Sequence, residues 1–159
     1  MQTVRVPMEE LIKVVRLQLE TAGRANLTVT GCSMLPMLRQ YRDSVILAPV
    51  RDNLKPGDIA LFRRESGQYV LHRVISVATN GYRFCGDNQA ETEMVTQQQL
   101  TAVVVGYIKN GKEYSGNSIG ERIYRWCQVH LFGLRKYYIA LRRRLGRLRG
   151  RLFNRRKSL

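Results

Sequence analysis

The fold is organised around residues 30–36, whose sequence is TGCSMLP. An extended apolar run at residues 27–29 leads into this stretch. Gly31 can adopt backbone angles that are closed to other residues, and Pro36 prevents a helix from continuing through the residues before it. We therefore predict that Ser33 is presented on a sharp turn at the end of a strand.

A serine hydroxyl becomes a nucleophile only when a neighbouring base removes its proton. The chain has two histidines: His72 lies in the β-branched run YVLHRVI, and His130 lies in a basic C-terminal region. A strand would hold the His72 ring rigidly, and an imidazole suits neutral pH because its unperturbed pKa is about 6.5. We expect His72 to act as general base at about 2.6 to 3.2 Å from Ser33. The backbone amide of Ser33 is the expected oxyanion donor.

Four short motifs occur in an order that resembles the type I signal peptidases. They are GCSMLP at residues 31–36, KPGDIALF at 55–62, LHRVI at 71–75 and GDN at 86–88. The resemblance runs from about residue 27 to residue 109, and the shared order makes it more specific than any single motif. A histidine before Arg-Val resembles the endoplasmic-reticulum type, whereas most bacterial members use a lysine. The resemblance implies a serine endopeptidase of mainly β fold, with Ser33 as nucleophile and His72 as base.

A third group usually orients the imidazole of such a pair. Asp87 matches the first aspartate of the Gly-Asp-Asn motif, and the resemblance implies that it holds His72. The family motif commonly has a second acidic residue several positions on, where this chain offers Glu91 or Glu93. Glu93 is therefore the reserve for this role. Asp87 is equally well explained as a turn residue whose carboxylate binds nearby backbone amides.

The resemblance also implies a peptide substrate, bound as an added β-strand and cut after small residues. Two alternatives remain open. One is a module that keeps the fold without the activity and captures a peptide, while its tail binds lipid or nucleic acid. The other is a self-cleaving switch similar to the LexA-type repressors, more distant relatives that use a serine and a lysine. The chain shows no obvious Ala-Gly self-cleavage site near its N-terminus, and its first helix is too short for a helix-turn-helix domain.

Three cysteines, at positions 32, 85 and 127, are odd in number and widely spaced. This pattern suits neither a disulfide framework nor a Cys-x-x-Cys metal site, and it indicates a reducing compartment. Cys32 is next to Ser33, but neighbours on an extended chain point to opposite sides. We expect no cofactor and no metal, and we rank a zinc site formed by Cys32, Cys85 and His72 below the serine mechanism.

Turn residues separate short apolar runs and predict a mainly β domain between two helical segments. Apolar side chains at three- and four-residue spacing in residues 7–22 predict an amphipathic helix packed on the domain. Strand patterns follow at residues 27–30, 44–49, 59–62, 69–77, 82–85 and 101–108. The predicted organisation is an N-terminal helix in residues 1–25, a signal-peptidase/LexA-like β catalytic domain in 26–118 and a basic helical tail in 119–159.

The C-terminal region carries most of the positive charge. Residues 121–159 contain 13 Lys and Arg against 1 acidic residue, whereas residues 1–120 contain 14 against 11. Apolar residues in the tail alternate spacings of four and three, which predicts a helix of about thirty residues with one apolar face. They are Cys127, Leu131, Leu134, Tyr138, Leu141, Leu145, Leu148 and Leu152.

Three partners suit such a helix, and we rank an anionic membrane surface, contacted through residues 121–156, first. Nucleic acid ranks second and another helix third. No run reaches the roughly 18 to 20 apolar residues of a spanning helix. Glu9 and Glu10 interrupt the stretch where a secretory signal needs an apolar core. We expect a cytoplasmic protein held peripherally at the inner face of the membrane, in an oligomeric state that the sequence does not indicate.

Overall fold

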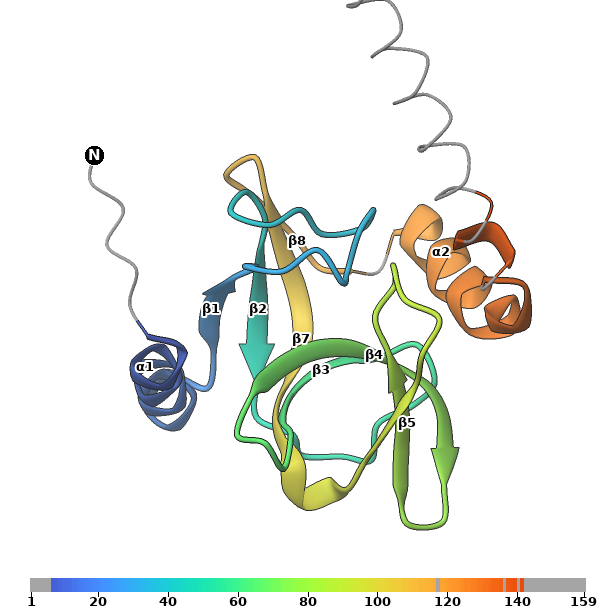
Figure 1. Ribbon diagram of the computed structural model, residues 1–159. Helices are drawn as coiled ribbons and strands as arrows, with labels where there is room; N and C mark the ends of the chain where they lie inside the picture. The colour runs from blue at the N-terminus through green and yellow to red at the C-terminus, as the bar shows by residue number, and fades with distance from the viewer. Residues whose placement is uncertain (1–6, 117, 136, 140, 142–159) are drawn as a thin grey trace, which may run out of the picture.

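The computed structural model describes residues 7–116, 118–135, 137–139 and 141. It consists of an N-terminal helix α1 (Met8–Ala22), an eight-stranded antiparallel sheet and a C-terminal helix α2 (Ile119–His130). Figure 1 shows α1 beside β1, with α2 at the other side of the molecule. The fold is therefore mixed α/β with more strand than helix.

The strands follow the predicted order, with two additions. Strand β6 (Glu93–Val95) and strand β8 (Lys112–Tyr114) lie outside the six predicted runs. The sheet order is β1-β2-β7-β3-β4-β5-β6, and β8 pairs with β7. A short 3-10 helix, η1 (Gln97–Gln99), joins β6 to β7. The remaining strands are β1 (Ala25–Thr28), β2 (Ser44–Ala48), β3 (Ile59–Arg63), β4 (Tyr69–Ala78), β5 (Gly81–Cys85) and β7 (Leu100–Lys109).

Helix α1 buries one face against the sheet. Ile12, Val15 and Leu19 lie three and four residues apart, so they share a helical face. Gly23 ends the helix in the left-handed conformation, at φ 68°, and its amide donates to the Leu19 carbonyl. The three apolar side chains pack into a core cluster that also contains Leu27, Met34, Leu38, Val45, Leu47, Ile59 and Leu61.

Strand β4 determines which side chains reach the candidate site, because successive residues of a strand point to opposite faces. His72 shares a face with Val74, which lies opposite Phe84 of β5. Phe84 in turn lies opposite Glu93 of β6. The register therefore brings His72 and Glu93 to the same face of the sheet and turns Arg73 to the other face.

Helix α2 is shorter than the tail pattern predicts. It begins at a capping box, in which the Ser118 hydroxyl and the Glu121 side chain bind each other's backbone amides. It ends at His130, because Leu131 adopts a non-helical turn before a new helical turn begins at residue 132. The prediction of one continuous helix from Cys127 is therefore wrong at Leu131, and Gly133 is a helix-weakening residue at that point. Residues 136, 140 and 142–159, which include Leu145, Leu148 and Leu152 of the predicted face, lie outside the described residues.

None of the described helices is long and apolar enough to cross a membrane.

Candidate functional site

Ser33 lies on an irregular turn between β1 and β2. Residues 33–37 form consecutive turns, in which the Leu38 amide donates to the Met34 carbonyl at 3.0 Å. Met34 and Leu38 are fully buried, which anchors the turn, while Ser33 stays partly exposed. Gly31 is outside the left-handed region, and a Cβ there would meet no atom within 4 Å. The turn therefore exists as predicted, but the conformational freedom of Gly31 is not what produces it.

Ser33 and His72 line the same cavity, which has a volume of about 250 Å³. One wall comes from residues 27–31 and the other from residues 68–72. Within the described part of the chain, no direct hydrogen bond joins the Ser33 hydroxyl to the His72 ring. The predicted contact of 2.6 to 3.2 Å is thus not formed in this conformation. Such bonds are often long in free enzymes and tighten when substrate binds.

Glu93 is the acidic group that holds His72. Its Oε1 lies 2.9 Å from His72 Nδ1, so a neutral ring donates from Nδ1 and keeps Nε2 as the basic nitrogen. Arg64 donates to both oxygens of the same carboxylate, at 2.6 Å and 2.8 Å. The ring also packs edge-on against Phe62, with ring centroids 6.1 Å apart. These contacts set the position of the imidazole from two sides.

Burial controls the proton affinity of His72, whose side chain is only 3% exposed. Burial lowers the pKa of His72 below its ordinary value, against the opposing charge and hydrogen bond of Glu93, while the charge of Arg64 lowers it further. Burial would raise the pKa of Glu93, but the hydrogen bond and charge of Arg64 outweigh this effect and hold it below its ordinary value. At neutral pH the site therefore contains a neutral imidazole beside an ionised carboxylate.

Asp87 has a different partner from the one that we predicted. Its carboxylate receives two hydrogen bonds from Arg73, from Nε and Nη2, each 2.8 Å long. Both side chains are almost completely buried, and Tyr124 of α2 donates to Asp87 at 3.2 Å. The residue that binds His72 is therefore Glu93, and not Asp87 as we had predicted. The reason is that β4 turns Arg73, rather than His72, toward Asp87.

The Arg73–Asp87 pair connects all four sequence motifs. Arg73 Nη1 donates to the Gly57 carbonyl at 2.7 Å, and its other nitrogens bind Asp87. The next residue, Asn88, donates its backbone amide to the Ser33 carbonyl at 2.7 Å. One continuous set of hydrogen bonds thus runs from the Gly57 turn through the histidine strand and the Gly-Asp-Asn loop to the serine turn.

Close packing fixes the Gly-Asp-Asn loop against the serine turn. A Cβ on Gly86 would lie 2.8 Å from the Ser33 carbonyl oxygen, so only glycine fits there without a shift. From the other side, Arg135 donates to the Gly86 carbonyl at 3.0 Å and to the Gln128 carbonyl at 2.7 Å. Arg135 is only 7% exposed. The sequence did not point to Arg135, because it is one of many arginines in a basic tail.

The remaining candidate residues make no hydrogen bond to the His72 ring within the described part of the chain. Glu91 is exposed, and its backbone carbonyl accepts a hydrogen bond from the Cys85 thiol at 3.1 Å. Burial raises the pKa of Cys85 to about 11, so this thiol is unreactive at neutral pH. Cys32 is exposed beside Ser33, and all three cysteines are free. The described residues contain no group of three or more His, Cys, Asp or Glu side chains placed to hold a metal ion.

A scan against protein-family models matches none, and a search among curated proteins finds no significant match.

The Glu93–His72–Arg64 arrangement predicts opposite effects of two substitutions on the pKa of His72. Glu93→Gln removes the charge that raises this pKa, so the pKa should fall further. Arg64→Gln removes a charge that lowers it, so the pKa should rise. The titration can be followed by NMR on the ring protons, with exposed His130 as the internal reference. Changes in the same direction, or no change in either variant, would contradict this arrangement.

The Arg73–Asp87 pair predicts a large loss of stability when one partner is removed. Asp87→Ala should lower the free energy of unfolding by about 3 to 5 kcal/mol, because it leaves a buried guanidinium without its counter-charge. Asp58→Ala is the matched control. The Asp58 carboxylate accepts a hydrogen bond from the Lys55 amide in an exposed turn, at 2.8 Å, and its loss should cost about 1 kcal/mol. Urea unfolding measures the free energy of unfolding of both variants. Equal losses of stability in the two variants would show that the buried pair contributes no more than an exposed turn.

Proposed function

We propose that the protein is a serine endopeptidase of the signal-peptidase-like type, with Ser33 as nucleophile, His72 as general base and Glu93 as the residue that orients the imidazole. The observation that supports it best is that Ser33 and His72 line one cavity while Glu93 binds the far nitrogen of the ring. A neutral, buried imidazole held in one tautomer is suited to accept a proton from a serine.

The proposed reaction proceeds in two halves. The Ser33 oxygen attacks the scissile carbonyl carbon as its proton passes to Nε2 of His72, and the backbone amide of Ser33 donates to the resulting oxyanion. When the C–N bond breaks, the imidazolium returns this proton to the leaving amine. A water molecule then attacks the acyl-enzyme ester and gives its proton to His72. Return of that proton to Ser33 releases the new carboxyl terminus.

The finer assignment to a signal-peptidase/LexA-like fold rests on the motifs and their contacts. The four motifs are separated by up to some fifty residues in the sequence, and hydrogen bonds connect all of them around the serine turn. Such convergence is expected when motifs serve one site, because residues that act together must meet in space. These contacts are independent of the motif sequences, and they therefore support the resemblance.

The proposed substrate is an extended peptide that enters the cavity between residues 27–31 and residues 68–72. Strand β1 is at the end of the sheet order among the described strands, so a peptide can pair with its outer edge. By resemblance, small residues precede the cut. The three free cysteines support a reducing, cytoplasmic location.

A peptide-binding module without catalysis is the second candidate. It is favoured by one observation: the Ser33 hydroxyl and the His72 ring share a cavity without a hydrogen bond between them in the described structure. In this case the cavity would hold a peptide, and the Ser33→Ala variant would retain it unchanged.

Profiling of a diverse peptide library by mass spectrometry tests the proposal. Cleavages produced by the wild-type protein should disappear in Ser33→Ala and slow by about 100- to 10,000-fold in His72→Ala. Ser66→Ala, in an exposed turn, is the matched control and should cleave like the wild type. Cys32→Ala should also retain activity, which separates serine from cysteine chemistry. Cleavage that persists in Ser33→Ala, or peptide retention without cleavage, would reject the peptidase.

A further inference from the structure

Helix α2 has an inner face that contacts the domain. Tyr124 donates to Asp87, and Gln128 donates to Tyr124. Arg125 donates to the Gly116 carbonyl at 3.1 Å, and its side chain covers Gly57. These contacts fix the orientation of the helix, and they therefore determine which of its side chains face solvent.

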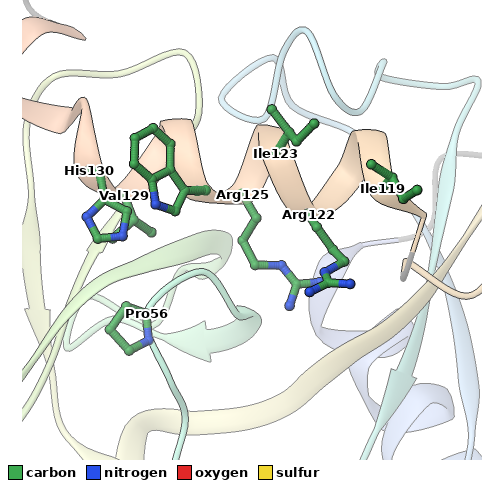
Figure 2. Close-up of a pocket in the computed structure, with 8 residues that line it drawn as sticks. Pro56, Ile119, Arg122, Ile123, Arg125, Val129 and His130 are labelled. Atoms are coloured by element: carbon green, nitrogen blue, oxygen red, sulfur yellow. The ribbon is translucent and has the colours of Figure 1, made fainter.

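The outer face of α2 exposes large apolar side chains. Ile119, Ile123 and Trp126 are 76%, 59% and 55% exposed, and their spacing of four and three places them on one side of the helix. Together with Pro56 they line an open groove of about 860 Å³. Figure 2 shows Ile119 and Ile123 on this helix, together with the Arg122 and Arg125 side chains. We call Ile119, Ile123, Trp126 and Arg122 the outer face of α2.

Exposure of apolar residues continues beyond α2. Leu134, Tyr138 and Leu141, which belong to the predicted apolar face of the tail, are 63%, 64% and 57% exposed. Of the described residues in 131–141, Arg135 and Ile139 are buried. These apolar side chains of the predicted face are therefore turned toward solvent, and exposed apolar surface of this extent indicates a binding surface.

Positive charge surrounds this apolar surface. Among the described residues, Arg122 and Arg125 line the groove, and no acidic side chain does. Glu121 is the only acidic residue in 121–159, and its carboxylate is engaged in the cap of α2. The sequence from residue 142 onward adds nine Lys and Arg and no acidic residue. A partner for this surface must therefore combine negative charge with an apolar layer.

We infer that the outer face of α2 docks on an anionic lipid bilayer. Ile119, Ile123 and Trp126 would enter the interface, while Arg122 contacts lipid phosphates. A nucleic acid would satisfy the charge and leave the isoleucines in water. A second copy of the chain would cover the isoleucines but bring two strongly basic tails together. The inference does not depend on peptidase activity.

The fluorescence of Trp126 tests the inference directly, because it is the only tryptophan in the chain. The full-length protein is mixed with vesicles of phosphatidylcholine and phosphatidylglycerol, and with vesicles of phosphatidylcholine alone. We expect a blue shift and protection from aqueous quenchers with the mixed vesicles, and a much weaker effect with neutral vesicles. Ser33→Ala should behave like the wild type, which keeps the result separate from any result on catalysis.

Two serine substitutions locate the contact. Ile123→Ser should weaken partitioning into mixed vesicles by about tenfold, because it removes one side chain from the apolar layer. Leu17→Ser is the matched control: Leu17 is exposed to 58% on α1, against 59% for Ile123, and its loss should leave partitioning unchanged. Neither side chain is buried, so both variants should fold, as thermal unfolding can verify.

Four results would overturn the inference. The first is vesicle binding that salt abolishes and that leaves the Trp126 spectrum unchanged, since this would be adsorption through the tail alone. The second is equal partitioning of Ile123→Ser and the wild type. The third is a lipid-free dimer, detected by light scattering, that Ile123→Ser dissociates. A Trp126 shift produced by RNA but not by vesicles would equally reject a lipid surface.

Discussion

The buried ion pair between Arg73 and Asp87 is the interaction on which the rest of the site depends. Its two hydrogen bonds of 2.8 Å join the strand that carries His72 to the loop that binds the Ser33 carbonyl. An ion pair buried this deeply tolerates little change in geometry, because either charge alone would be left without solvent or partner. The relative position of Ser33 and His72, the proposed nucleophile and base, is therefore fixed through residues that have no proposed part in proton transfer.

Alternation along β4 divides two tasks between neighbouring residues. Arg73 turns to Asp87 and α2 and connects the motifs, whereas His72 turns to Glu93 and the cavity. Arg64 keeps Glu93 ionised, and burial keeps the imidazole neutral. A general base needs this combination, because it must be unprotonated at working pH and held in one tautomer. Glu93, which fixes the orientation of the ring, raises the pKa of His72, whereas burial and the charge of Arg64 lower it.

Helix α1 and six of the strands could be predicted from the sequence, because hydrophobic periodicity reports local structure. The order of the motifs also predicted that Ser33 and His72 lie in one region of the molecule. Prediction from the sequence missed β6, a three-residue strand too short to show alternation, and it therefore ranked Glu93 behind Asp87 as the partner of His72. Arg135 was missed for another reason: burial of one arginine among many depends on tertiary contacts. The sequence also showed the apolar side chains of the tail, but it did not show whether they face the core or solvent. The contacts of Tyr124 and Arg125 with the domain decide this for α2.

We propose that His72 activates Ser33. The rate at which an alkyl fluorophosphonate phosphonylates Ser33, followed by intact mass and peptide mapping across pH, tests it most directly. The account predicts a single adduct on Ser33 and a rate that falls as pH drops through the pKa of His72, below its ordinary value of about 6.5. That midpoint should coincide with the pKa found by NMR for the same histidine. Absence of labelling, an adduct on another residue, or an unchanged rate in His72→Ala would contradict it.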